Sequence, residues 1–281
     1  MLGSAFLFAV LNGLIKILGP AFRVWDIGFY RFAFGLAMLL VISGWDQNPF
    51  KSHNLRLLIM RGITGSMAFI SLVTAIRLIP ISTAMVIFYS FPAFAALCSF
   101  LLFGESITKS ELSCVLVAFI GVTVLFDFRL EGGLVGQTMA LISGSFAGLT
   151  VSIVKKLREN NGPVIIYLYF CLLGTVITFP RFISDPQSPT NMYDWLILAG
   201  IGCASISAQL LMNEGFRYCK SWEGGLFLTS EVIFASVFGL VFLSESVTWR
   251  FWVGGILIFT SVVVLNLGST RRRPRFINSS T

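Results

Sequence analysis

Long apolar runs recur along the whole chain, and short polar segments separate them. Residues 32–42 are apolar at every position, and residues 196–212 are interrupted only by two serines and Gln209. A strand of a transmembrane β-barrel would instead alternate apolar and polar positions over about ten residues. Lipid offers the backbone no hydrogen-bond partner, and a helix of about 20 residues crosses the hydrocarbon core of a bilayer. The pattern therefore predicts membrane-spanning helices.

The apolar runs predict about ten spans, joined by loops too short to hold a soluble domain. The expected fold class is an all-α integral membrane protein. We expect its helices at residues 2–19, 27–44, 57–78, 82–104, 110–127, 133–154, 163–181, 195–216, 223–243 and 250–268.

Composition agrees with the apolar pattern: 56% of the 281 residues are hydrophobic, 12% are charged, and the mean hydropathy is +0.86. Soluble domains carry about 25% charged residues. The five cysteines lie in or at the ends of apolar segments with no close pair, which predicts neither a disulfide framework nor a metal site. Because P-loop, zinc-protease and serine-hydrolase motifs are absent from the sequence, we expect no enzyme and no cofactor.

Positive charge is distributed unevenly between the predicted loops. With the N-terminus inside, internal loops and span ends hold 13 lysines and arginines, whereas external ones hold 5. Because cytoplasmic loops are enriched in these residues, we expect both termini in the cytoplasm and a multi-pass protein of the inner or plasma membrane. The net charge of +7 lies in loops and in a basic tail, 269–281, rather than on a folded basic face, so no nucleic-acid partner is expected.

The second half of the chain repeats the first. Shifting residues 82–128 by 140 positions aligns them with 222–268 and gives ten identities in 47 positions. The aligned pairs include Glu105 with Glu245, each followed by serine and then, two positions on, threonine. Five helices per copy is an odd number, so the second copy must enter the membrane from the opposite side. We therefore expect two inverted repeats, 1–128 and 129–268, an arrangement typical of secondary transporters with a substrate site near the midplane.

Several short motifs occur in a fixed order along the two halves. They are Tyr30-Arg31-Phe32, Arg61-Gly62, Ala75–Pro80, Phe91-Pro92, Phe103–Thr108, Gly215-Phe216-Arg217 and Leu243–Thr248. In these motifs the chain resembles the EamA group of the drug/metabolite transporter superfamily over essentially its whole length. One departure is Val232, which stands where the first half has Pro92.

The resemblance implies ten helices in two inverted five-helix repeats around a central cavity. Members of the family move small organic solutes, including amino acids, nucleotide-related metabolites, vitamins and drugs. Within the superfamily, the arginine in the second span and a glutamate in the ninth are most similar to uptake carriers for S-adenosylmethionine or riboflavin.

Charged residues inside spans are the first functional candidates, because each costs about 2.5–3.5 kcal/mol at the helix centre. Lys16 and Arg31 lie three or four residues from an external helix end, so their long side chains either reach the interface or face a cavity. Glu231 lies roughly 12 Å inside its span and must face a wet cavity, pair with a cation or be protonated. We interpret Glu231 as a cavity or coupling residue, with a structural ion pair as the alternative.

Uncharged polar residues inside spans complete the candidate set for substrate binding. They are Asn12, Tyr89, Ser90 and Gln209. Pro92 lacks a backbone N–H and predicts a break in the fourth helix, with a freed carbonyl near the midplane. Glu105 and Glu245 are expected to fix helix ends, because their repetition in both halves indicates architecture rather than binding.

These features together predict a secondary-active transporter of a small polar organic metabolite, such as an amino-acid, nucleoside-like or vitamin-like solute. The expected partners are that solute, the lipid bilayer and, as one coupling option, a proton. Two other classes stay open at this point. An intramembrane enzyme would need a cluster of nucleophile, base or metal ligands near one interface. A non-transporting interaction protein would have little use for Glu231 deep in a span.

Overall fold

The computed structural model of the protein describes residues 1–19, 22–42, 53–103, 109–125, 133–218, 221–243 and 249–270. Glu105, Glu245 and residues 271–281 of the basic tail lie outside the described residues. The described part of the chain contains helices and no strands. The helices are α1 (Leu2–Ile17), α2 (Val24–Ile42), α3 (Leu55–Leu78), α4 (Ile81–Phe88), α5 (Phe91–Phe103), α6 (Lys109–Leu125), α7 (Gly133–Leu157), α8 (Pro163–Ser184), α9 (Met192–Tyr218), α10 (Ser221–Phe242) and α11 (Trp249–Thr270).

Each of the ten predicted spans coincides with one of these helices or, in one case, with two. The exception is 82–104, which α4 and α5 share. The two helices are separated at Tyr89 and Ser90, immediately before Pro92. Pro92 has no amide to donate to the carbonyl of Phe88, four residues earlier, but it is tolerated in the first turn of α5. The local sequence thus accounts for the break.

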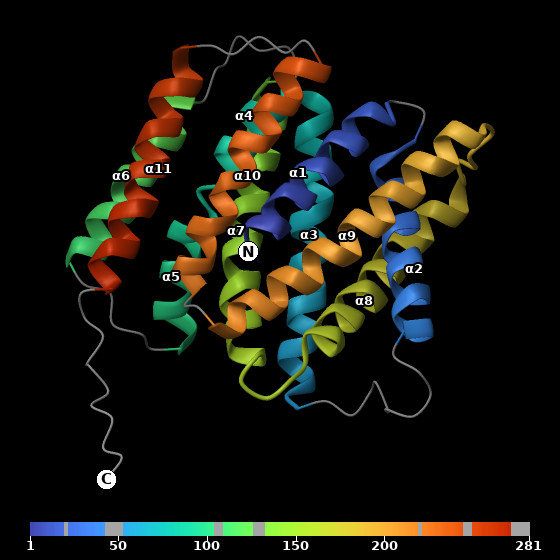
Figure 1. The fold of residues 1–281 in the computed structure, drawn as a ribbon, viewed down its shortest axis with the longest axis horizontal. Helices are drawn as coiled ribbons and strands as arrows, with labels where there is room; N and C mark the ends of the chain where they lie inside the picture. Colours follow the sequence, from blue (N-terminus) through green and yellow to red (C-terminus); the bar gives the residue numbers. More distant parts are fainter. Residues whose placement is uncertain are drawn as a thin grey trace.

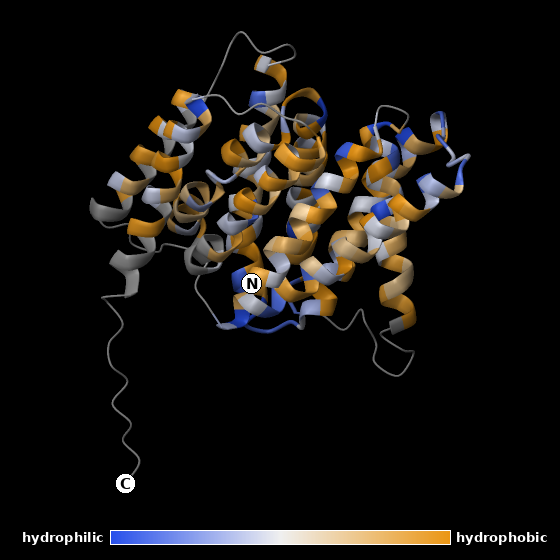
Figure 2. Ribbon diagram, turned by 45° about the horizontal axis from the view of Figure 1, so that its top comes forward, coloured by the Kyte–Doolittle hydropathy of each residue, from blue (hydrophilic) through white to orange (hydrophobic). Residues whose placement is uncertain are grey.

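Several segments of the described chain are long and apolar enough to cross a membrane. Figure 2 shows hydrophobic residues along the helices and hydrophilic residues gathered at their ends. Large apolar side chains also face outward, among them Leu101 and Val41, which are 68% and 78% exposed. Six described segments meet the criteria of length and hydropathy for spanning: Val24–Val41, Leu55–Leu78, Ile81–Leu102, Gly133–Leu157, Pro163–Ser184 and Met192–Tyr218. The protein is therefore an all-helical, multi-pass membrane protein.

Helices from the first part of the chain pack mainly against helices from the second. α1 lies against α9 and α10, α3 against α7 and α8, and α2 against α8 and α9. α4 and α5 both pack on α7, while α6 and α11 form a pair at one side of the molecule (Figure 1). The middle of the bundle is thus enclosed by helices that are far apart in the sequence.

Two glycines allow α7 to approach the break between α4 and α5. A Cβ atom on Gly144 would lie 2.9 Å from the carbonyl oxygen of Phe88, and one on Gly148 would lie 2.7 Å from the amide nitrogen of Ala95. Both distances are shorter than a Cβ atom can accept, so only glycine fits at these positions. This close contact fixes Tyr89, which lies within the break, relative to the centre of the bundle.

Candidate functional site

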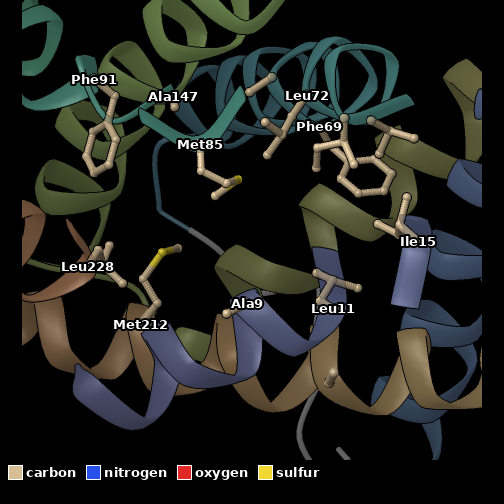
Figure 3. Close-up of a cluster of buried hydrophobic side chains, with 14 of the residues drawn as sticks. Ala9, Leu11, Ile15, Phe69, Leu72, Met85, Phe91, Ala147, Met212 and Leu228 are labelled. Carbon is tan, nitrogen blue, oxygen red and sulfur yellow. The ribbon is translucent and has the colours of Figure 1, made fainter. Parts of the chain in front are cut away.

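A cavity of about 110 Å³ lies at the centre of the bundle. Most of its lining is apolar. Figure 3 shows Phe69 and Leu72 of α3 on one side, facing Leu11, Met212 and Leu228 of α1, α9 and α10 on the other. The remaining lining is polar or charged and divides into two groups, which we call the glutamate end and the arginine end.

The glutamate end consists of Glu231 on α10, Asn12 on α1 and Tyr89 at the α4–α5 break. Asn12 Nδ2 donates to Glu231 Oε1 at 2.7 Å, and the Tyr89 hydroxyl donates to Glu231 Oε2 at 2.5 Å. Glu231 is 3% exposed and forms no ion pair with any described residue. Each carboxylate oxygen therefore has a donor, but among the described residues no cation neutralises the group.

The arginine end consists of Arg31 on α2 and Arg61 on α3. Arg31 Nε donates to the Ser205 hydroxyl at 2.7 Å, and Arg61 Nη2 donates to Gln209 Oε1 at 3.2 Å. The two arginines are only 2% and 1% exposed. Both partners lie on α9, so this helix orients the two guanidinium groups by uncharged contacts.

Aromatic rings cover the faces of both guanidinium groups. Arg31 Cζ lies 3.9 Å from the centre of the Phe69 ring and 5.5 Å from that of Phe170. Arg61 Cζ lies 4.4 Å from the centre of the same Phe170 ring. Cation–π contacts of this kind stabilise a desolvated cation by about 2 kcal/mol. The two cations thus share one aromatic ring and lie close to each other in the cavity wall.

Three guanidinium nitrogens at the arginine end have no hydrogen-bond partner among the described residues. They are Arg31 Nη1, Arg61 Nε and Arg61 Nη1, and all three are buried. Gly65, one turn after Arg61 on the same face of α3, makes room for the guanidinium, because a Cβ atom there would collide with Arg61 Nη1. Buried donors normally find a partner, and exceptions are found where function requires them.

The structure brings five of the sequence-predicted residues to the wall of this one cavity, and they come from five different parts of the chain. They are Asn12, Arg31, Tyr89, Gln209 and Glu231. Two other candidates lie elsewhere. Lys16 Nζ donates to the carbonyls of Ile76 and Ile79 at the C-terminal end of α3, at 2.5 and 2.9 Å. The Ser90 hydroxyl donates to the carbonyl of Ile87 at 2.8 Å, within the helix break.

Arg61 was not among the candidates predicted from the sequence, because it was counted with the positive charges at the internal ends of the spans. α3 begins at Leu55, so Arg61 lies about 9 Å along the helix axis and well inside the bundle. The spacing of Arg61 and Gly65 was the available signal, since residues four apart share a helix face. Phe69, Phe170 and Ser205 were not separable by sequence from the many other phenylalanines and serines in spans.

Comparison with known proteins agrees with the helical fold. The sequence profile of the EamA-like transporter family matches residues 1–127 and 134–267. The pseudopaline exporter CntI of Pseudomonas aeruginosa (strain UCBPP-PA14) is 24% identical over 264 residues, which cover 94% of this chain and 93% of that protein. Solute carrier family 35 member G1 of Homo sapiens is 24% identical over 289 residues, covering 96% of this chain and 77% of that protein.

Further relatives include an uncharacterized transporter of Helicobacter pylori (strain J99 / ATCC 700824), 24% identical over 92% of this chain. The chain also superposes on a solved crystal structure with a TM-score of 0.70 and 16% sequence identity. That match covers 97% of this chain and 98% of the other, so the two chains share their fold. The closer resemblance to S-adenosylmethionine or riboflavin carriers stays a prediction.

Proposed function

Because the chain belongs to the EamA-like transporter family and is a multi-pass membrane transporter, we propose that it is a secondary-active carrier of a small polar organic metabolite. The cavity is its substrate site. The observation that carries this proposal is the lining of that cavity, where buried charged and polar groups from six helices or helix breaks converge. Charges inside a membrane protein mark substrate or ion pathways far more often than they support the fold.

Both halves of the chain contribute to the site. Asn12, Arg31, Arg61 and Tyr89 come from residues 1–128, and Gln209 and Glu231 from residues 129–268. A small shift of one half relative to the other would separate these groups and open the cavity to one side. This geometry supports alternating access, in which two halves rock around a fixed site.

We further propose that the two halves are inverted repeats of five spans each, ten spans in all. The family profile matches two segments of similar length, which supports the division. The pattern of helix contacts also supports this division. When each helix is replaced by its counterpart in the other half, the same pairs of packed helices result. The pairs α2–α8 and α6–α11 exchange into themselves, and the pair α3–α7 exchanges into α9–α1. An odd number of spans per half makes the repeats antiparallel in the membrane.

The excess of positive charge on alternate loops supports the proposal that both termini are cytoplasmic. Burial of Arg61 lowers the internal count from 13 to 12 against 5 external residues, so the bias remains. A single-cysteine scan on a cysteine-free background checks it. Residues 182–194 should be labelled from outside in intact cells, and the tail only after permeabilisation. Tail labelling in intact cells would reverse the orientation.

Glu231 is proposed either to bind a cationic part of the solute or to carry a coupling proton. Its position supports both roles, since it lines the cavity, and among the described residues no arginine or lysine neutralises it. The structural-pair alternative requires such a cation. Among the described residues, no three of histidine, cysteine, aspartate and glutamate come together in a metal-binding group.

The proposed function is tested with purified protein in liposomes. Vesicles loaded with a metabolite mixture are compared with empty vesicles for counterflow of the same labelled mixture, and the accumulated solutes are identified by mass spectrometry. A carrier should accumulate one or a few chemically related solutes. Protein-free vesicles and vesicles with the heat-denatured protein are the controls. If no solute accumulates above both controls in either protein orientation, the carrier function is rejected.

A further inference from the structure

The arginine end of the cavity contains more positive charge than its surroundings balance. Among the described residues, no carboxylate forms an ion pair with Arg31 or Arg61. The neighbouring Ser205 and Gln209 are uncharged. Two cations in one desolvated wall repel each other, and each loses its hydration without gaining a counter-ion. An arrangement that costs stability in this way indicates a binding site for an anion.

The aromatic rings do not replace a counter-ion that accepts hydrogen bonds, because they contact only the faces of the guanidinium groups. The unsatisfied atoms, Arg31 Nη1, Arg61 Nε and Arg61 Nη1, are edge donors. Guanidinium N–H groups form short, charge-assisted hydrogen bonds to carboxylate oxygens. On Arg61, Nε and Nη1 are both without a partner among the described residues, whereas Nη2, the nitrogen that lies on the same side as the Nε–H, donates to Gln209. Arg61 therefore offers two separate donors, on different sides of the guanidinium, to anionic oxygens.

The glutamate end of the cavity has the complementary charge. Glu231 accepts hydrogen bonds from Asn12 and Tyr89, and these neutral donors leave it the negative group of the site. Most of the other lining is apolar, with Leu11, Leu72 and Met212 among it. A solute that fits this wall combines anionic groups, a hydrocarbon part and a cationic group.

We propose that the transported metabolite is an aminocarboxylate with more carboxylates than amines. Its carboxylates bind Arg31 and Arg61, and its protonated amine binds Glu231. Two guanidinium groups and one carboxylate give the cavity a net charge of +1, which a solute with two carboxylates and one ammonium group neutralises. The proposal rests on the carrier function proposed above and names the substrate class of that same cavity.

Matched amino acids test the proposal on purified full-length protein in lipid nanodiscs. The probes are L-aspartate, L-glutamate and L-2-aminoadipate, each paired with its counterpart without the distal carboxylate: L-asparagine, L-glutamine and L-lysine. Inorganic phosphate is a further probe, and sodium chloride equalises the ionic strength. At least one of the three acids should raise the Tm of the wild-type protein by several degrees, because a ligand that binds only the folded state stabilises it.

The counterparts should have a smaller effect than the acids in each pair. The proposal is overturned if no acid stabilises the protein more than its counterpart does. It is overturned equally if lysine or phosphate alone stabilises the protein, because a diamine or an inorganic anion lacks the combination that both ends require.

Two variants of Arg61 separate a binding role from a structural one. In Arg61→Gln the response to the acids should fall at least about tenfold in apparent affinity, because the charge and the free guanidinium donors are lost. The same change should leave the ligand-free Tm equal to or above that of the wild type, since it removes a buried, unbalanced charge. Arg61→Lys keeps the charge but not the planar set of donors and should also bind the acids more weakly. A lowered ligand-free Tm together with an unchanged response in Arg61→Gln would make Arg61 a structural residue and overturn the proposal.

Transport in liposomes distinguishes this proposal from the carrier function. If an acid binds with the expected dependence on Arg61 but is not translocated, the anion site stands and the carrier function fails. If the vesicles accumulate only solutes without a carboxylate, the carrier function stands and the anion site fails.

Discussion

At the glutamate end of the cavity both oxygens of Glu231 accept hydrogen bonds, whereas at the arginine end three buried N–H groups of Arg31 and Arg61 have no partner among the described residues. Both ends are almost fully buried, so exposure to water does not account for the difference. A group whose hydrogen bonds are complete holds its position without a ligand. A group with free donors gains most when a ligand arrives. We therefore attribute positioning and coupling to the glutamate end and most of the affinity to the arginine end.

The two ends also differ in their relation to the repeat. The shift of 140 positions that aligns the halves places Phe91 opposite Glu231 and Cys171 opposite Arg31. Neither pair matches in charge. The proposed repeat would account for the helices around the cavity, whereas the charged groups of each end come from one half, Arg31 and Arg61 from residues 1–128 and Glu231 from residues 129–268. An asymmetric solute with opposite charges at its ends suits such a site.

Replacing Glu231 should have the largest effect, because it removes the only negative charge among the described cavity residues. Glu231→Gln keeps the shape of the side chain and its capacity to form hydrogen bonds, but removes its charge. We expect net uptake into liposomes to fall about 100-fold, because a charge-assisted contact worth about 3 kcal/mol is lost. If Glu231 carries the coupling proton, pH-driven uptake is lost but solute exchange remains. If it binds the amine, binding weakens at every pH.

Gln209→Glu is the matched control, because it adds a carboxylate at the arginine end instead of removing one. It should pair with Arg61, its present neighbour at 3.2 Å, and compete with anionic solutes. Wild-type rate and pH dependence in well-folded Glu231→Gln would remove Glu231 from the mechanism and leave the comparison of the two ends without support.

Removing one donor from the glutamate end should have a smaller effect. Tyr89→Phe deletes the hydroxyl that donates to Glu231 Oε2 at 2.5 Å. Loss of one hydrogen bond to a charged group costs about 1.5 kcal/mol, so we expect an uptake rate about tenfold lower. Tyr30→Phe is the control: its hydroxyl donates to the carbonyl of Gln187, away from the cavity, at 3.2 Å. Equal effects of the two changes would indicate a general loss of folded protein rather than a specific contact.

The helices were predictable from the sequence, and the partners of the charged residues were not. Apolar runs located the described helices to within a few residues because lipid imposes helices of a minimum length. Depth alone identified Glu231, since a short side chain cannot reach the interface from there. Depth in the span could not distinguish Arg31 from Lys16, because both lie near a helix end. Only the packing of the helices shows that Arg31 faces the cavity and Lys16 faces the end of α3. Arg61 was missed for the same reason.

Gly65→Ala tests the arginine end without changing any charge. The added methyl group would collide with Arg61 Nη1 and lie 2.9 Å from Phe170 Cε2, so the flexible guanidinium must move away from its present position. We expect KM for an anionic solute to rise about threefold to tenfold with little change in kcat, since a shift of the guanidinium weakens but does not abolish the contact. Gly255→Ala is the control, because its Cβ atom would lie 3.8 Å from Val86, an ordinary contact. A rise in KM for both variants would mean that the change is not specific to Arg61.

The smallest effect on transport is expected for Lys16, the cation that lies outside both ends of the cavity. Lys16 Nζ donates to the carbonyls of Ile76 and Ile79, which end α3 and favour a positive charge. Lys16→Met keeps the length of the side chain and removes these charge-assisted hydrogen bonds. We expect unfolding to become easier by about 2–3 kcal/mol, and the Tm in nanodiscs to fall by roughly 4–10 °C, while KM of the folded protein stays at the wild-type value. Lys156→Met is the matched control, because its ion pair with Glu159 is exposed and contributes less than about 1 kcal/mol. If Lys16→Met instead raised KM and left the Tm unchanged, Lys16 would lie in the substrate path and would be a third cation of the arginine end.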